Sequence, residues 1–329
     1  MTSKSYGSIS AVTRLSLCLL AMAAIAAAPA RADDGARQAG DGAFRPAVTD
    51  PRYALETGPR VCHDEAHHEF HRLGARFAAF AAVLRADGYR LSTFETPFDA
   101  AALRRCEVLV IANALPSDQP WDDLPRPTPP AFTAAEVEAV RAWVADGGAL
   151  LLIADHRPLA GAASGMAAAF GFRFGDGYAL ALPADAPPGP IVPRMPDLFA
   201  AKTGALRPHP ITDGRLGGPP VTQVATFIGQ AFQAEPGAEP LLVLPEGFFS
   251  LDPAKLWAFD AATPRQPVAG WLQGATRKVG RGRVAVFGEA AMFTAQVASN
   301  GQKMGLDAAG AEQNTRFLRN VIAWLAATE

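Results

Sequence analysis

Short apolar runs alternate with amphipathic stretches along the first half of the chain. The runs predict β-strands at residues 60–63, 89–95, 106–113 and 149–156. Between them, residues 68–88 and 132–148 place apolar side chains at helical spacing, and the second stretch begins with a capping box of Thr133 and Glu136. Apolar strands that alternate with such helices are typical of a parallel sheet with helices on both faces.

The second half of the chain is less regular. Residues 183–220 are rich in proline and glycine, and the strands expected after them lie at residues 221–229, 240–249 and 269–278. Residues 282–293 predict a strand that runs through Gly288 and Glu289 into a helix, and residues 310–326 predict another amphipathic helix. We therefore expect one doubly wound α/β domain at residues 59–329, with an irregular β-rich insertion at about 175–280.

The first 32 residues have the pattern of a secretory signal peptide. Basic residues precede an uncharged run at residues 15–28, and small residues occupy the positions that a signal peptidase recognises before Ala32. The run is short for a membrane span, although a retained anchor is the alternative, and no other segment suits a span. We expect cleavage after Ala32, a periplasmic or secreted protein, and a flexible leader at residues 33–58.

Composition narrows the range of partners. The chain is 49% hydrophobic and 19% charged, as expected of a globular protein. Its net charge is −2, and cleavage of the signal would remove three basic residues and no acid, so neither nucleic acid nor an anionic membrane is an expected partner. Cys62 and Cys106 remain after cleavage, and the sequence leaves open whether they form a disulfide or stay as buried thiols.

Polar side chains follow four of the predicted strands at their carboxyl ends. In an open parallel sheet these ends form one rim, which is where ligands bind. The rim residues expected from the sequence are Glu65, His67, His68 and His71 after the first strand, then Asn113, Asp155, His156 and Glu289.

A metal site is one interpretation of this rim. His67 and His71 are four residues apart, so a helix would place both on one side. Together with Asp155 and His156 they would offer nitrogen and oxygen ligands to a divalent metal such as zinc. The segment is not a zincin motif, because Glu69 stands between the two histidines and would face elsewhere.

Acid–base chemistry without a metal is the second interpretation. A histidine oriented by a carboxylate is a general base near neutral pH, and His68 or His156 would take that role. The expected catalytic set comprises His68, His156, Asp155, Glu289 and Glu65. The structural alternative is that Asp64 caps a helix and the histidines are exposed residues at its start.

Other chemistries find little support. The chain has no G-x-S-x-G motif, no phosphate loop and no G-x-G-x-x-G motif, and Cys106 stands at the start of its strand and so lies at the opposite end of the sheet. Four aromatic residues would line a sugar or peptide groove or, as is more frequent, pack in the core: Trp121, Phe248, Phe249 and Trp271.

The order of segments resembles a family. Residues 132–158 and 209–215, with "GGALLLIADH" and "HPITDGR", resemble an uncharacterised branch of the class I glutamine amidotransferase-like superfamily, related to ThuA-like proteins and to domains of gliding-motility ABC systems. The resemblance covers most of residues 58–328 and implies a flavodoxin-like sheet with strand order near 2-1-3-4. Amidotransferases of this superfamily use a cysteine at a strand–helix elbow, and no cysteine is so placed here, so glutamine hydrolysis is disfavoured.

Two functions follow as expectations. The first is a hydrolase that uses the histidines and carboxylates of the rim, with a carbohydrate-related substrate suggested by the ThuA-like resemblance. The second is a non-catalytic binding or scaffold domain of the cell envelope, with a glycan or small-molecule ligand at the same rim.

Overall fold

The structure is a computed structural model that describes residues 1–2, 38–182 and 191–327, so the expected signal peptide lies almost entirely outside the described residues. Residues 38–182 and 191–327 belong to one compact unit, which contains the helices and strands described below. Within the described part of the chain, no helix combines the length and the apolar character that a membrane crossing needs.

A nine-stranded sheet forms the centre of this unit. Its parallel half has the order β3 (Arg90–Phe94), β2 (Arg60–Asp64), β4 (Val108–Ala112), β5 (Ala149–Ile153) and β15 (Gly282–Phe287). The first four follow the predicted order 2-1-3-4. The antiparallel half adds β14 (Leu272–Val279), β10 (Phe232–Ala234), β6 (Phe172–Phe174) and β11 (Glu239–Val243).

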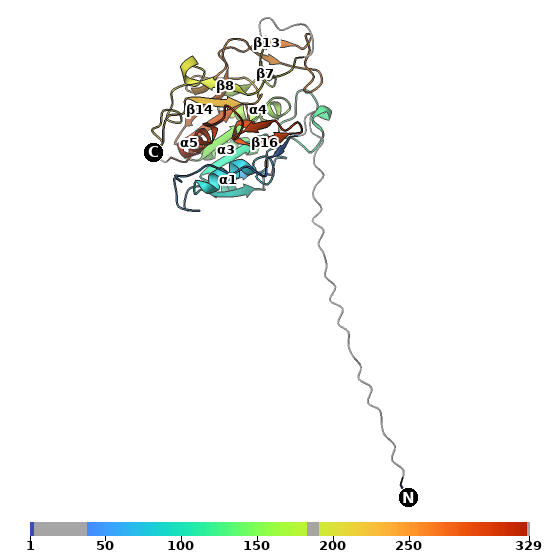
Figure 1. Ribbon diagram of the computed structural model, residues 1–329, viewed down its shortest axis with the longest axis vertical. Coiled ribbons are helices and arrows are strands. Elements are labelled where there is room, and N and C mark those ends of the chain that lie inside the picture. Colours follow the sequence, from blue (N-terminus) through green and yellow to red (C-terminus); the bar gives the residue numbers. More distant parts are fainter. Residues whose placement is uncertain (3–37, 183–190, 328–329) are drawn as a thin grey trace. The chain divides into compact units, whose positions relative to one another are not determined.

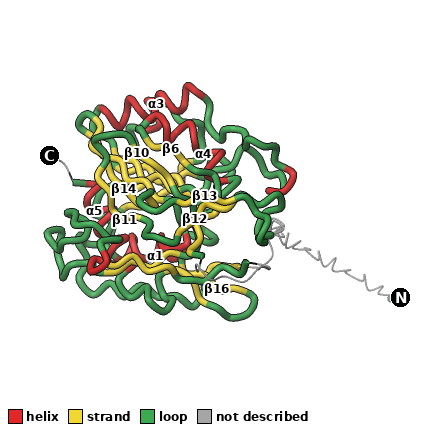
Figure 2. The backbone as a smooth tube through the Cα atoms, turned by 90° about the horizontal axis from the view of Figure 1, so that it is seen from above, coloured by secondary structure: helices red, strands yellow, loops and turns green. Residues whose placement is uncertain are grey.

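Helices cover both faces of the sheet, as the alternation of elements predicts. One face carries α1 (Ala78–Ala86) and α5 (Asn314–Ala326), and the other carries α2 (Ala100–Leu103), α3 (Ala134–Ala145) and α4 (Leu159–Ala169). Figure 1 labels α1, α3, α4 and α5, and Figure 2 shows α1 and α3 on opposite sides of the strands. Successive residues of β5 point into the two cores in turn, with Leu151 on the α1 side and Leu152 on the α3 side.

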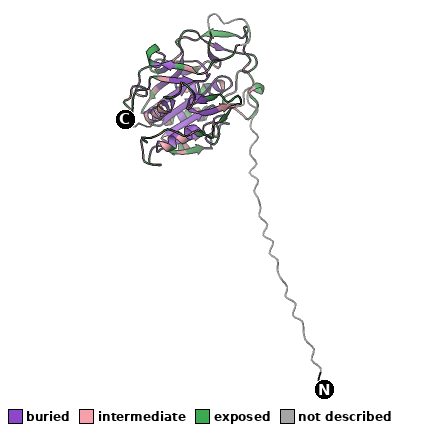
Figure 3. Cartoon of the chain, viewed as in Figure 1, coloured by how far each residue is buried: buried purple, intermediate pink, exposed green. Residues whose placement is uncertain are grey.

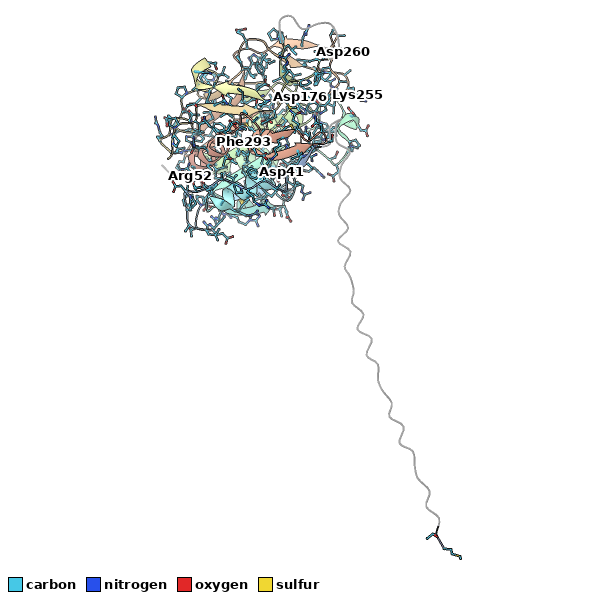
Figure 4. The ribbon with its side chains drawn as sticks, in the orientation of Figure 1. Asp41, Arg52, Asp176, Lys255, Asp260 and Phe293 are labelled. Atoms are coloured by element: carbon cyan, nitrogen blue, oxygen red, sulfur yellow. A yellow bond between two sulfur atoms is a disulfide. The ribbon has the colours of Figure 1, made fainter. Side chains whose placement is uncertain are left out.

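The central strands are buried along their length, as Figure 3 shows. The core continues beyond the sheet through Phe293, which Figure 4 labels. Its ring lies 5.2 Å from that of Phe287 and 6.2 Å from that of Phe317, measured between centroids. This packing anchors the segment that follows β15 and carries part of the rim.

The first predicted helix begins ten residues later than expected. The sequence predicts a helix from residue 68, but α1 starts at Ala78, and residues 65–77 form turns. His68 has a positive φ of 50°, which interrupts a helix, and the backbone N–H of Phe70 donates to the carbonyl of Asn113 instead. The histidines therefore do not share a helical face, and Phe70 is not part of an apolar helix stripe.

The segment after β15 also differs from its prediction. It forms a single 3-10 turn, η3 (Ala291–Phe293), and then two strands, β16 (Ala295–Ala298) and β17 (Lys303–Gly305). From residue 38 the expected flexible leader joins this small sheet, because β1 (Gln38–Gly40) pairs antiparallel with β16. Further along the leader, Tyr53 packs edge-on against Tyr89.

Of the expected β-rich insertion, β10, β11 and β14 join the central sheet, and the other strands form two small sheets. One consists of β7 (Tyr178–Ala181), β12 (Phe248–Leu251) and β13 (Arg265–Pro267), and the other pairs β8 (Asp197–Ala200) with β9 (Gln223–Thr226). Short turns η1 (Trp121–Asp123) and η2 (Ala201–Thr203) complete the described elements.

Cys62 and Cys106 form a disulfide, which settles the question that the sequence leaves open. Cys62 lies in β2 and Cys106 lies two residues before β4, and the bond closes a loop with a sequence separation of 44 residues. Such a bond restricts the unfolded chain and so stabilises the folded one.

Removal of this disulfide should be costly. A Cys62→Ser/Cys106→Ser variant is expected to lose roughly 3 kcal/mol of unfolding free energy, measured by denaturant titration. Wild-type protein treated with a reductant serves as the control and should show the same loss. An unchanged denaturation midpoint in both samples would mean that the bond does not constrain the chain.

Candidate functional site

The carboxyl ends of four parallel strands meet at one cavity. His71 follows β2, Asp155 and His156 follow β5, and Glu289 follows β15, and all four line the cavity. Asn113, which follows β4, bonds to two of them. The rim predicted from the sequence is therefore present for these five residues.

Asn113 is the centre of the hydrogen-bond network. Its side-chain oxygen accepts the backbone N–H of Asp155 at 2.8 Å, so its nitrogen is the donor. That nitrogen lies 3.0 Å from Oδ2 of Asp155 and 2.9 Å from Nδ1 of His71. Because Nδ1 of His71 must then accept, the neutral ring carries its proton on Nε2. Asn113 thus fixes both the rotamer of Asp155 and the tautomer of His71.

Asp155 and Glu289 form a buried carboxyl pair. Oδ1 of Asp155 accepts the N–H of Ala290 at 2.6 Å, and Oε2 of Glu289 accepts the N–H of Met292 at 2.8 Å. Oε1 of Glu289 is buried and has no hydrogen-bond partner within the described structure. Burial raises the pKa of Asp155 to about 7. Burial and the neighbouring charge of Asp155 raise the pKa of Glu289 well above its usual value.

His156 is held in an aromatic cluster. Its ring stacks on Tyr178 at 4.1 Å between centroids and meets Trp257 edge-on at 4.7 Å. Its Nδ1 lies 2.8 Å from the carbonyl oxygen of Arg157, which can only accept, so Nδ1 carries the proton and Nε2 has the lone pair. Burial lowers the pKa of His156 to about 4, and the ring is neutral at pH 7.

The cavity has a volume of about 390 Å³, which is the size of a small-molecule site. Its walls are mostly apolar or aromatic, and amide side chains add polar groups. The aromatic lining residues are Phe70, Trp121, Phe227 and Trp257, and the amides are Gln38, Gln296 and Gln302.

Unusual backbone conformations occur around this cavity. Asn113, Ile228 and Trp257 have positive φ values of 66°, 77° and 63°. For Ile and Trp this conformation is unfavourable, and strain of this kind is concentrated at functional sites. The next residue, Gly229, lies so close to the carbonyl of Gly288 that a Cβ there would collide with it.

Three of the predicted site residues lie elsewhere. Glu65 accepts the N–H of Leu73 at 2.9 Å and pairs with Arg72. His67 is buried between two carboxylates, with Nδ1 2.8 Å from Asp64 and Nε2 2.8 Å from Glu136.

His68 is the third of these residues, and its side chain is partly exposed and pairs with Asp118 at 3.0 Å. None of the three residues Glu65, His67 and His68 lines the cavity. The reason is the turn at residues 65–77, which replaces the expected helix and sends the side chains in different directions.

The expected metal set is not assembled. Of its members, His71, Asp155 and His156 line the cavity, whereas the ring nitrogens of His67 are bonded to Asp64 and Glu136. In residues 38–182 and 191–327, no three His, Cys, Asp or Glu side chains are grouped so that they would hold a metal ion.

Sequence reasoning missed several residues of the cavity. Of the four aromatic residues singled out for a groove, Trp121 lines the cavity and the others do not. No sequence pattern pointed to Trp257, Gln296 or Gln302. Trp257 and Gln302 lie in irregular segments, and Gln296 lies in a strand that the sequence did not predict. The positive φ values that place Ile228 and Trp257 also leave no trace in a single sequence.

By sequence, no family model and no curated protein matches the chain. Among solved structures, the mmIFT52 N-terminal domain is similar with 13% identity and a TM-score of 0.56, over 82% of this chain and 98% of that one. This likeness shows the fold alone.

Two further solved structures are similar to this chain with lower TM-scores. A ThuA-like protein from Bacteroides uniformis has 14% identity and a TM-score of 0.40, over 83% of this chain and 93% of that one. A protein described as a GMP synthase subunit, from Thermoplasma acidophilum, has 12% identity and a TM-score of 0.38, over 82% and 94%.

Proposed function

We propose that this protein is a hydrolase that acts outside the cytoplasm on a sugar-sized, carbohydrate-related substrate. The observation that carries the proposal is the pair of buried carboxyl groups, Asp155 and Glu289, in one aromatic-walled cavity. Two carboxyl groups whose environments separate their roles are the usual means of acid–base hydrolysis of glycosidic bonds.

The two carboxyl groups have different roles in this proposal. Glu289 keeps its proton at neutral pH because of burial and the charge of Asp155, so it is the general acid that protonates the leaving group. Asp155, with its pKa raised to about 7 by burial, is the base that takes a proton from water. This assignment replaces histidine with a carboxylate as the base, because burial leaves both cavity histidines neutral and weakly basic.

The histidines position the substrate. The Nε2–H of His71 is a donor and the Nε2 lone pair of His156 is an acceptor, so together they suit hydroxyl groups, which both donate and accept. Trp121 and Trp257 offer flat apolar surfaces of the kind on which sugar rings stack.

The proposed compartment rests on two observations. The sequence has the pattern of a signal peptide, and the Cys62–Cys106 disulfide is of a kind that persists in oxidising compartments.

A non-catalytic binding domain is the alternative function. It is favoured by the hydrogen bonds of Asp155, since both of its carboxyl oxygens already accept a partner within the protein. In that case the cavity would bind the same class of ligand without turnover.

The pH dependence of turnover tests the hydrolase. A panel of 4-nitrophenyl glycosides should give at least one substrate for which kcat/KM rises with pH through about 7, because Asp155 must lose its proton to act as the base. An Asp155→Asn variant should lose roughly a factor of 10² to 10⁴ in kcat/KM.

A Glu138→Gln variant removes a carboxylate from the exposed surface of α3 and is the matched control. Its activity should equal that of the wild type. Saturable binding of a sugar with no turnover of any glycoside would instead support the binding domain.

A further inference from the structure

We propose that the cavity selects a ligand that carries a primary ammonium group among its hydroxyl groups, of which an amino sugar is the simplest example. This inference names the ligand class of the proposed site. It rests on the proposed function for the choice of this cavity as the binding site, and it does not require that the ligand be hydrolysed.

The charge of the lining is the first argument. Among the described residues that line the cavity, the ionisable side chains are Asp155, Glu289 and two neutral histidines, and none is Lys or Arg. A carboxylate or phosphate on the ligand would meet no cation there, and burial beside two carboxyl groups would be unfavourable. An ammonium group would meet a negative charge instead.

Two arginines close to lining residues have other partners. Arg76 lies over the ring of Phe70 and donates to the carbonyl of Gln38 at 3.0 Å. Arg157 donates to the carbonyl of Pro253 at 3.3 Å. Neither side chain is part of the cavity lining.

An unpartnered acceptor is the second argument. Oε1 of Gln296 is buried and accepts no hydrogen bond within the described structure, and this residue lines the cavity. The amide nitrogen of Gln296 donates to Thr294 at 2.9 Å, so its oxygen is the atom left over. A buried acceptor without a donor is unfavourable, and a ligand that brings several N–H or O–H groups removes that cost.

The aromatic walls are the third argument. Trp121 and Trp257 line the same cavity as the carboxyl pair. Aromatic faces attract organic cations, most strongly where water is excluded. A cavity with aromatic walls and a carboxylate among its lining residues therefore favours an ammonium group over a neutral hydroxyl at the same position.

Binding of an amine should be coupled to the release of one proton from the protein. An ammonium group near Asp155 favours the ionised form of this carboxyl, while Glu289 keeps its proton. Binding of the amine should therefore release a proton below about pH 7 and strengthen as the pH rises towards 7. A neutral sugar should show neither effect.

Isothermal titration of the signal-free protein with D-glucosamine, D-glucose and D-glucuronate tests the inference. At about pH 6.5 we expect glucosamine to bind at least tenfold more tightly than glucose, and glucuronate to bind least. Between about pH 5 and pH 7 the affinity for glucosamine should rise while that for glucose stays flat. Equal affinities, a preference for glucuronate, or no binding of glucosamine would overturn the inference.

An Asp155→Asn variant should lose the preference for glucosamine, and Glu138→Gln, on the surface of α3, should keep it. The amide introduced by Asp155→Asn would turn an N–H towards either Asn113 or Ala290, so this variant is also checked by thermal unfolding. If it does not fold, the pH dependence of wild-type binding decides the matter alone. Turnover of neutral glycosides without an ammonium preference would refute only this inference, and the preference without turnover would refute only the hydrolase.

Discussion

A Glu289→Gln variant should melt at a higher temperature than the wild type at pH 7.5 and should have lost its activity. Glutamine has the same shape, and its oxygen can accept the N–H of Met292 that Oε2 of Glu289 accepts now. It has no proton to give to a leaving group, so we expect kcat/KM to fall by roughly 10²-fold or more.

The gain in stability follows from the raised pKa of Glu289. Burial and the charge of Asp155 raise this pKa in the folded protein above the value of the unfolded chain, so the folded state holds a proton that the unfolded state releases. Burial of Glu289 therefore does not lower the free energy of unfolding below about pH 4.5, the usual pKa of glutamate. As the pH rises above that value, the free energy of unfolding falls. Glutamine avoids this loss, and a gain of about 1 kcal/mol at pH 7.5 is typical when an unfavourable functional group is removed.

Melting curves at pH 4 and pH 7.5 separate this explanation from a purely structural role. The variant should match the wild type at pH 4 and exceed it by roughly 2 °C or more at pH 7.5. The exposed Glu138→Gln variant should show no such pH-dependent gain. A Glu289→Gln protein that is less stable at both pH values would mean that the carboxyl group holds the fold together and is not a catalytic acid.

The fold was largely predictable because its signals are local. Strands β4 and β5 are apolar throughout, α3 begins with the predicted capping box, and strands at these positions can only join in a few orders. The convergence of Asn113, Asp155 and Glu289 followed from topology, because the carboxyl ends of parallel strands share one edge.

The remaining parts of the site depend on contacts that a single sequence does not display. The helix expected at residue 68 is displaced by His68 in a left-handed conformation and by a hydrogen bond between Phe70 and Asn113, which are far apart in the chain. The wall formed by Trp257 likewise depends on an irregular segment that packs on Tyr178. Local periodicity contains no information about either contact.

Replacement of His67 should destabilise the protein more than replacement of any other histidine outside the cavity. His67 lies between two carboxylates at 2.8 Å, and its ring packs between Phe98 and Phe132. Burial opposes the charged ring, but the bonds and charges of Asp64 and Glu136 outweigh it and raise the pKa of His67.

Glu136 ties this cluster to the rest of the fold. One of its oxygens accepts the N–H of Phe98 at 3.1 Å as well as bonding to His67, and the other closes the capping box of α3 with Thr133. Burial would raise the pKa of Glu136, but the bonds from Thr133 and His67 lower it to about 2. His67→Ala would leave two buried carboxylates without their shared cation, and such a loss costs about 3 to 5 kcal/mol.

The loss of stability in His67→Ala should depend on pH. Because the pKa of His67 is raised in the folded protein, its stabilising effect is fully present below about pH 6.5 and declines as the pH rises through the folded value. The loss in His67→Ala, measured by urea titration, should therefore be larger at pH 6 than at pH 9. His68→Asn is the matched control, since asparagine tolerates the positive φ at this exposed site, and it should change stability by less than about 0.5 kcal/mol. If the two variants were equally stable, the histidine would be a surface residue as in the simple helix-start interpretation, and the cluster would not join β2 to α3.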